Sequence, residues 1–198
     1  LASSGVLVMS RPDKLYVKRR GGLADSEMYY NGKDLWLVGN NLKIYAQAEV
    51  SASVEDLIKA LQTTFDRPMP ASNLLLPNPN VPMMLNVTKA MDLGTGVIRE
   101  KECYHLAFRS DEADWQIWIN KVGEPYPVRL TVNPKDVDSP AYQFDIMDFK
   151  TEKQVAAFNF NYVPAADMKK ADTSDIPDLD KTPASLSKQK VNELDDLD

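Results

Sequence analysis

The stretch from Cys103 to Ile119 constrains the fold of this chain more than any other, because its apolar side chains recur at every second position. A period of two is that of a half-buried β-strand, whereas a helix repeats its apolar residues every three or four positions. The residues that share a face are Tyr104, Leu106 and Phe108, then, after an acidic turn, Trp115, Ile117 and Ile119. The stretch therefore predicts two antiparallel strands joined by a turn.

Length and charge exclude several classes of protein. The chain has 198 residues, which is enough for one domain with a sizeable core, and a formal net charge of −6. Residues 167–198 hold nine acidic and five basic side chains, so most of that charge lies in the last part of the chain. A concentrated basic surface is absent, which argues against nucleic acid as a partner. No run approaches the roughly 18 apolar residues of a transmembrane segment.

The first part of the chain indicates a series of antiparallel strands. Asn31-Gly32 is the strongest hairpin signal among them, since a type I′ turn needs two residues with positive φ. The expected strands cover residues 6–9, 14–20, 27–30, 34–38 and 42–48.

The pattern then changes to a helical period. Val54, Leu57, Ile58 and Leu61 have the spacing of an amphipathic helix, and Ser53 is a suitable N-cap. The segment beyond it, 67–86, contains five prolines, so only short helical turns are expected, near 74–76 and 83–87.

Strands return after Met91. Gly94-Thr95-Gly96 predicts a turn or bulge, and alternation continues through 128–132, 142–146 and 158–162. The expected fold is therefore mainly β, of the α+β class. Five antiparallel strands, a helical and Pro-rich insertion and five more strands would form one long curled sheet, and the insertion would lie across one of its faces.

No group of residues predicts catalysis. Cys103 and His105 would point the same way from one strand, about 6–7 Å apart, but no carboxylate that could orient the histidine is evident nearby. Asp111, Glu112 and Asp114 fit a solvated turn better than a pair of catalytic acids. With one cysteine and one histidine in the chain, a conventional zinc site is not expected either. We expect no enzyme activity, no metal and no cofactor.

Several motifs resemble a family of predicted bacterial periplasmic proteins of unknown function, grouped with the LolA/LolB outer-membrane lipoprotein carriers. The resemblance covers roughly 5–166. It rests on Arg11-Pro-Asp-Lys-Leu15, Tyr30-Asn-Gly-Lys33, Cys103-Tyr-His-Leu-Ala-Phe-Arg109 and Asp114-Trp-Gln-Ile-Trp118.

The resemblance implies a LolA-like fold, an unclosed and strongly curved antiparallel β-barrel whose concave face is covered by a lid. Here the lid would be 53–91. Residues 1–166 would form this half-barrel, without its first elements, and 167–198 would be an acidic, flexible tail. The abrupt apolar start of the chain fits a secreted periplasmic protein whose signal peptide has been removed.

The function implied is non-catalytic binding of a hydrophobic ligand, such as a lipid, an acyl chain or a lipidated protein, in the concave face. The alternative is a periplasmic sensor or interaction module with a filled core, which would bind a protein partner through a sheet edge or the acidic tail. The residues expected to line the cavity and its lid are Leu57, Leu61, Leu74, Leu75, Met83, Met84, Leu106, Phe108, Trp115, Ile117, Phe144 and Phe160.

Overall fold

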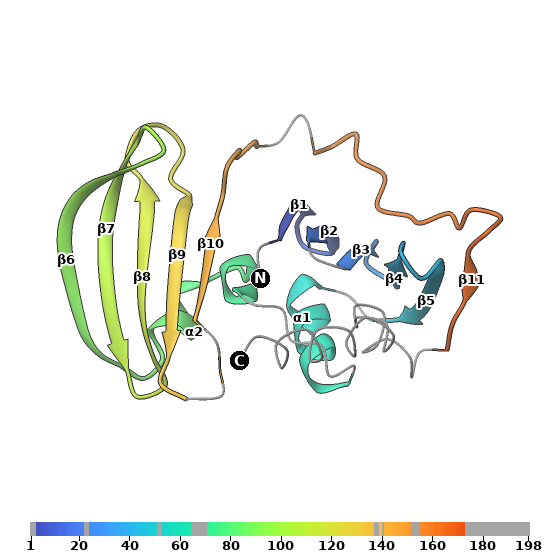
Figure 1. Ribbon diagram of the computed structural model, residues 1–198, viewed down its shortest axis with the longest axis horizontal. Helices are drawn as coiled ribbons and strands as arrows, with labels where there is room; N and C mark the ends of the chain where they lie inside the picture. Colours follow the sequence, from blue (N-terminus) through green and yellow to red (C-terminus); the bar gives the residue numbers. More distant parts are fainter. Residues whose placement is uncertain are drawn as a thin grey trace, which may run out of the picture. The chain divides into compact units, whose positions relative to one another are not determined.

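The computed structural model describes residues 3–21, 24–50, 53–64, 71–136, 139, 141–151 and 155–172. The chain divides into two compact units. The first unit comprises Leu1–Ser72 and Glu152–Asp198, and the second unit comprises Asn73–Thr151. Each unit is built on one sheet (Figure 1), so the mainly β, largely antiparallel character expected from the sequence is confirmed. The described strands form two sheets in place of the one long sheet expected from the sequence, and neither sheet closes into a barrel.

The first unit contains a six-stranded sheet in the order β1-β2-β3-β4-β5-β11, in which only the pair β5–β11 is parallel. The antiparallel strands follow one another along the chain, as the alternating pattern predicts. The strands are β1 (Ser4–Ser10), β2 (Lys14–Gly21), β3 (Ala24–Tyr30), β4 (Asp34–Gly39), β5 (Ile44–Glu49) and β11 (Lys169–Lys170).

Helix α1 (Val54–Thr63) supplies the core of the first unit. Ser53 caps it as predicted, because its hydroxyl oxygen accepts a hydrogen bond of 3.0 Å from the backbone N–H of Asp56. Leu57 and Leu61 are 0% and 1% exposed. Leu15, Tyr30, Leu35 and Leu37 share one sheet face and are also buried, so this is the face that α1 covers (Figure 1).

A later segment of the chain covers the other face of this sheet. Residues 158–162, expected to be the last strand, have no ladder partner; they lie along the sheet through aromatic contacts instead. Phe158 packs on Tyr16 with ring centroids 4.8 Å apart. Tyr162 packs against Tyr29 at 5.4 Å and against Tyr45 at 5.6 Å. We call residues 155–165 the aromatic strap; it belongs to the orange stretch that precedes β11 in Figure 1.

Beyond the aromatic strap, the chain joins the edge of β5. Lys169 and Lys170 pair with Ile44 and Tyr45, and Lys43 forms an ion pair of 2.7 Å with Asp167. The acidic tail expected over 167–198 thus begins against β5. Its residues 173–198, for which flexibility was expected, lie outside the described residues.

A partly buried carboxylate lies on the face that the aromatic strap covers. Glu27 accepts hydrogen bonds from Tyr16 (2.9 Å), Lys18 (2.9 Å), Tyr29 (2.7 Å) and Asn40 (3.0 Å). Burial by itself raises the pKa of Glu27, but these four donors outweigh burial and lower the pKa to about 2. Burial and the nearby Glu27 raise the pKa of Tyr16 to about 12.

This carboxylate predicts a pH dependence of stability. The folded pKa of Glu27 lies below its ordinary value of 4.5, so the folded state binds fewer protons than the unfolded state. The contribution is complete above pH 4.5 and is lost as the pH falls from there toward about 2. Thermal melts followed by circular dichroism should show this loss. The melting temperature of Glu27→Gln should fall less over the same window, and equal slopes for the two proteins would contradict the assignment.

The second unit contains an antiparallel sheet in the order β10-β9-β8-β7-β6. It is preceded by two short helices, η1 (Ser72–Leu75) and α2 (Asn80–Met84), where short helical turns were expected. The strands are β6 (Val87–Ile98), β7 (Lys101–Ser110), β8 (Ala113–Asn120), β9 (Pro127–Pro134) and β10 (Tyr142–Asp145). The hairpin predicted over Cys103–Ile119 is confirmed as β7–β8.

The expected lid, 53–91, is not a single structural piece. Helix α1 belongs to the first unit, whereas η1 continues into α2 and the second unit. The helical turn expected over 83–87 ends early, since Asn86 has a φ of 63° and β6 begins at Val87. Asparagine accepts this left-handed conformation more readily than most residues. The bulge expected near Gly94 is present as a register shift between Asp92 and Thr95.

Candidate functional site

One face of the second sheet carries large apolar side chains on four neighbouring strands. The ladder pairs Phe108 with Trp115 and Leu106 with Ile117, and the pairing continues through Leu130 to Phe144. We call this set the apolar face. It consists of Tyr104, Leu106, Phe108, Trp115, Ile117, Ile119, Leu130, Val132, Tyr142 and Phe144.

Burial across the apolar face is uneven. Ile117 and Leu130 are 8% and 3% exposed, so its centre is shielded from solvent. Tyr104 and Phe144, toward its margins, are 49% and 42% exposed. A large apolar side chain that stays in contact with water forgoes about 1.5–3 kcal/mol of hydrophobic stabilisation. The margins of the face can therefore gain from contact with an apolar molecule.

The opposite face of the same sheet combines charged side chains with a small apolar cluster, in which Trp118 packs against the buried Cys103 and Val128. Arg129 binds both carboxylate oxygens of Asp145, at 2.7 and 2.8 Å, and Arg99 approaches the same carboxylate at 3.0 Å. Hydrogen bonds from Arg129 lower the pKa of Asp145. Partial burial opposes this effect, and the positive charges of Arg129 and Arg99 add to it. The two faces thus differ in that only the opposite face carries these ion pairs between arginine and aspartate.

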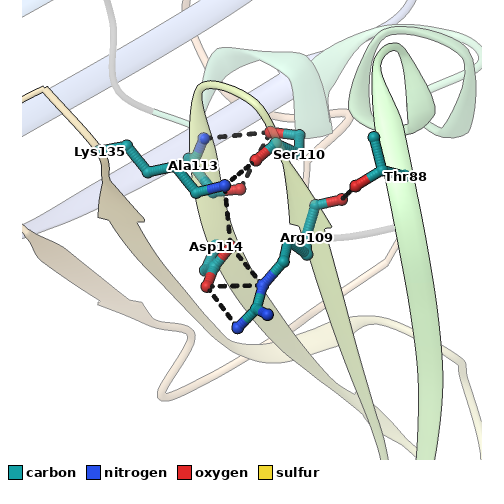
Figure 2. A network of polar contacts seen from close by, with 6 residues as sticks. All are labelled: Thr88, Arg109, Ser110, Ala113, Asp114 and Lys135. Atoms are coloured by element: carbon teal, nitrogen blue, oxygen red, sulfur yellow. Dashed lines mark hydrogen bonds and ion pairs between the residues drawn. The ribbon is translucent and has the colours of Figure 1, made fainter.

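A polar network fixes the end of the β7–β8 hairpin (Figure 2). Arg109 binds Asp114 through Nε at 3.1 Å and through its terminal nitrogen at 3.1 Å. Lys135 donates to the backbone oxygen of Ser110 and lies 3.7 Å from Asp114. Thr88 donates to the backbone oxygen of Arg109 at 3.2 Å. Because its members come from β6 to β8 and the residue after β9, the network holds four strand ends in register.

A shallow hollow of about 230 Å³ adjoins this network on the side of the sheet opposite the apolar face. It is lined by Lys89, Met91, Ala107, Arg109, Asp114 and Gln116, together with parts of Phe108 and Trp115. Pockets for drug-sized ligands start at roughly 300 Å³ and are enclosed by predominantly apolar side chains. The hollow is therefore smaller than a usual site for a drug-sized ligand.

Cys103 and His105 do not form an activated pair. The thiol of Cys103 is buried and donates to the backbone oxygen of Lys101 at 3.4 Å, and burial raises its pKa. His105 stacks on Trp118 with ring centroids 4.1 Å apart, and its Nε2 lies 2.8 Å from the side-chain oxygen of Gln116. A thiol with a raised pKa is protonated at neutral pH and is a poor nucleophile.

The structure places the twelve residues expected to line a ligand cavity in three settings. Five belong to the apolar face: Leu106, Phe108, Trp115, Ile117 and Phe144. Four lie in η1 and α2, where Leu74, Leu75 and Met83 are half-buried and Met84 is 43% exposed. Three are buried within the first unit: Leu57, Leu61 and Phe160. A single cavity lined by all twelve stays a prediction.

Five members of the apolar face were not among the expected site residues: Tyr104, Ile119, Leu130, Val132 and Tyr142. The same alternation that identified Leu106 and Ile117 contains them, so the signal was present in the sequence. For Leu130, Val132 and Tyr142, what it lacked was the order of the strands. The ladder shows that Leu130 faces Ile117 on one side and Phe144 on the other.

Within the part of the chain that the structure describes, no cluster of three or more histidine, cysteine, aspartate or glutamate side chains has a geometry that could hold a metal ion. None of its helices has the length and apolar character needed to cross a membrane.

Comparison with known proteins gives one family. A family model described as "Predicted periplasmic protein (DUF2092)" matches residues 1–173. No curated protein matches the chain.

Proposed function

Because the chain belongs to this family of predicted periplasmic proteins, we propose that it is a non-catalytic periplasmic protein that binds a hydrophobic ligand on the apolar face of its second sheet. The ligand class is a lipid, an acyl chain or the acyl chain of a lipidated protein. A LolA-like arrangement, in which η1 and α2 act as part of a lid, belongs to the same proposal.

The observation that carries this proposal is the exposure of large side chains on the apolar face. Tyr104, Tyr142 and Phe144 are 49%, 36% and 42% exposed, and all three border the buried centre formed by Ile117 and Leu130. Exposed large apolar side chains that border one apolar cluster commonly mark a binding site. Scattered single exposed residues would not carry the same meaning.

The energetics fit an acyl chain. Burial of one methylene contributes about 0.8 kcal/mol, so a long acyl chain contributes on the order of 10 kcal/mol before the costs of binding are subtracted. The apolar face spans β7 to β10, which at about 4.8 Å per strand is roughly 14 Å wide. No catalytic group is required for such binding.

Substitution of Phe144 tests the proposal. The change Phe144→Glu places a carboxylate among the apolar side chains at a half-exposed position, so the fold should tolerate it while an acyl chain should not. We expect at least a tenfold loss of affinity for a fluorescent long-chain fatty acid, measured by titration. The matched control is Val122→Glu, which introduces the same charge at a loop position that is 70% exposed and outside the apolar face.

Native mass spectrometry after detergent-free purification complements the titration. A bound lipid that disappears in Phe144→Glu and persists in Val122→Glu would support the proposal. An apo mass for the unmodified chain, together with no uptake of the fatty acid or of phospholipid from vesicles, would reject it.

The second candidate function is a periplasmic interaction module that binds a protein partner. Two observations favour it. Leu74, Leu75 and Met83 are half-buried already, as expected of side chains that fill space within the protein. In addition, no strand among the described residues pairs with the outer edge of β1, which carries no charged side chain.

A further inference from the structure

Strand β1 is the outermost strand of the first sheet. All seven of its residues pair with β2, from Ser4 opposite Arg20 to Ser10 opposite Lys14. Among the described residues, no strand pairs with its other edge. Such an edge presents a row of backbone N–H and C=O groups that can pair with a further strand.

This edge lacks the features that usually prevent pairing. Residues 4–10 read Ser-Gly-Val-Leu-Val-Met-Ser, with no charged residue and no proline. Val6 and Leu7 are 54% and 43% exposed. The outer strands of the second sheet differ: β6 carries Lys89, Asp92 and two register shifts, and β10 is four residues long and ends at Asp145. Natural proteins protect edges with such charges, irregularities and short strands.

The sequence of β1 is close to a palindrome about Leu7. In an antiparallel pair of two β1 strands centred there, Leu7 would face Leu7, Val6 would face Val8 and Ser4 would face Ser10. Gly5 opposite Met9 is the one departure from symmetry, and the fold explains it. A Cβ atom at Gly5 would lie 2.0 Å from the backbone oxygen of Lys18 in β2, so no larger residue fits.

We propose that β1 is a homodimer interface, in which two copies of the chain pair their β1 strands antiparallel about Leu7 and join their first sheets into one. Leu7 points to the face that α1 covers, since it pairs with Val17 next to Leu15, and the partner's β1 would bury it. On the opposite face, the partner's β1 would likewise bury Val6 and Val8. The inference does not rest on ligand binding by the second sheet.

Electrostatics permit this pairing. Strand β2 carries Lys14, Lys18, Arg19 and Arg20, and a dimer would contain two such strands. They would be separated by two intervening β1 strands, or about 14 Å at 4.8 Å per strand. That distance exceeds the Debye length of about 8 Å at physiological ionic strength, so their repulsion would be largely screened. Because a single pair of strands buries little area, we expect a dissociation constant in the micromolar range.

Sedimentation equilibrium tests the interface directly. The chain should form dimers between about 10 and 200 µM, and Leu7→Lys should weaken association at least tenfold, because two ammonium groups would then meet at the symmetry axis. The control is Val97→Lys, which introduces the same charge at a 68% exposed position of β6 and should leave the dimer intact. Circular dichroism establishes that each variant is folded.

Cysteine cross-linking tests the register and does not depend on the Leu7→Lys variant folding. In a Cys103→Ala background, Leu7→Cys should form an intermolecular disulfide on mild oxidation. Residues directly opposite in an antiparallel pair have Cβ atoms about 4.5–5.5 Å apart, close to the spacing of a disulfide. Val6→Cys would meet its own counterpart only diagonally, at about 7–8 Å, and should cross-link at least several-fold more slowly.

Three results would overturn the proposal. A monomer at about 200 µM with no cross-link from Leu7→Cys would mean that another segment of the polypeptide covers the edge or that the edge stays solvated. Equal cross-linking of Val6→Cys and Leu7→Cys would exclude the register. Open-ended oligomers, in place of dimers, would exclude the twofold pairing.

Discussion

The Leu57→Ala variant should lose about 2–5 kcal/mol of unfolding free energy, the range found when a fully buried leucine is truncated to alanine. Leu57 is 0% exposed, and its helix also buries Val54, Ile58 and Leu61. The surroundings have little freedom to close the cavity, because the opposing sheet face is held by the β2–β5 ladder. Urea denaturation followed by circular dichroism measures the loss. For a chain of this length, the melting temperature should fall by roughly 10 °C in the middle of that range.

The matched control for Leu57→Ala is Lys59→Ala, on the exposed side of the same helix. Alanine is a good helix former, so this change should alter stability by less than about 0.5 kcal/mol. Similar, small effects of both substitutions would mean that α1 does not pack on the sheet in solution.

Replacement of Glu27 by alanine is expected to cost about 3 kcal/mol. Its carboxylate accepts four hydrogen bonds, two of them from the tyrosines that the aromatic strap packs on. Removal of the acceptor would leave two tyrosine hydroxyls and an ammonium group without their partner in a half-buried site, and orphaned donors of this kind are expensive. The same urea titration measures the effect.

Glu49→Ala is the comparison for Glu27→Ala. Glu49 is also on the first sheet and forms an ion pair with Lys33, but that pair is 3.8 Å long and the Glu49 side chain is 78% exposed. Exposed pairs contribute little, so a change below about 1 kcal/mol is expected. If the two variants were equally stable, the Glu27 carboxylate would have to be solvated and not part of a buried network.

Alternation in the sequence predicted which segments are extended, but not how each extended segment is used. The segments around Leu106, Ile117 and Leu130 became ladder strands as expected. Phe158, Phe160 and Tyr162 alternate just as clearly, yet they pack on the Tyr16 face of a sheet without joining it. A period of two reports an extended backbone with one packed side, and both arrangements satisfy it.

The turn signals in the sequence also predicted the structure only in part. Asn31-Gly32 marks a hairpin correctly, but the type I′ turn expected there is wrong, since Gly32 has a φ of 98° and Asn31 is not in the left-handed region. The side-chain oxygen of Asn31 instead accepts hydrogen bonds from the N–H groups of Lys33 and Asp34. Two consecutive residues with positive φ occur at Arg99 and Glu100, where the sequence gives no such signal.

Residue spacing alone could predict six of the ten members of the apolar face, because they lie within one hairpin: Tyr104, Leu106, Phe108, Trp115, Ile117 and Ile119. Strand order could not be predicted in this way, because residues 121–126 separate β8 from β9, residues 135–141 separate β9 from β10, and local spacing says nothing about which strand lies beside which. Leu57, Leu61 and Phe160 show the converse limit. Their spacing correctly predicts that these side chains are buried, but it does not say in which of the two units they are buried.

The discontinuity of the first unit sets the order in which the protein can be completed during synthesis. Strands β1 to β5 leave the ribosome first, yet the aromatic strap and β11 emerge only after the whole second sheet has been made. The second sheet consists of hairpins between neighbouring strands, contacts that form early because their loops are short. Trp36 and Val38 are buried on the face that the strap covers, so on the nascent chain they would remain exposed to water until residues 155–165 have been synthesised. The sheet that is translated first is therefore the last to be finished.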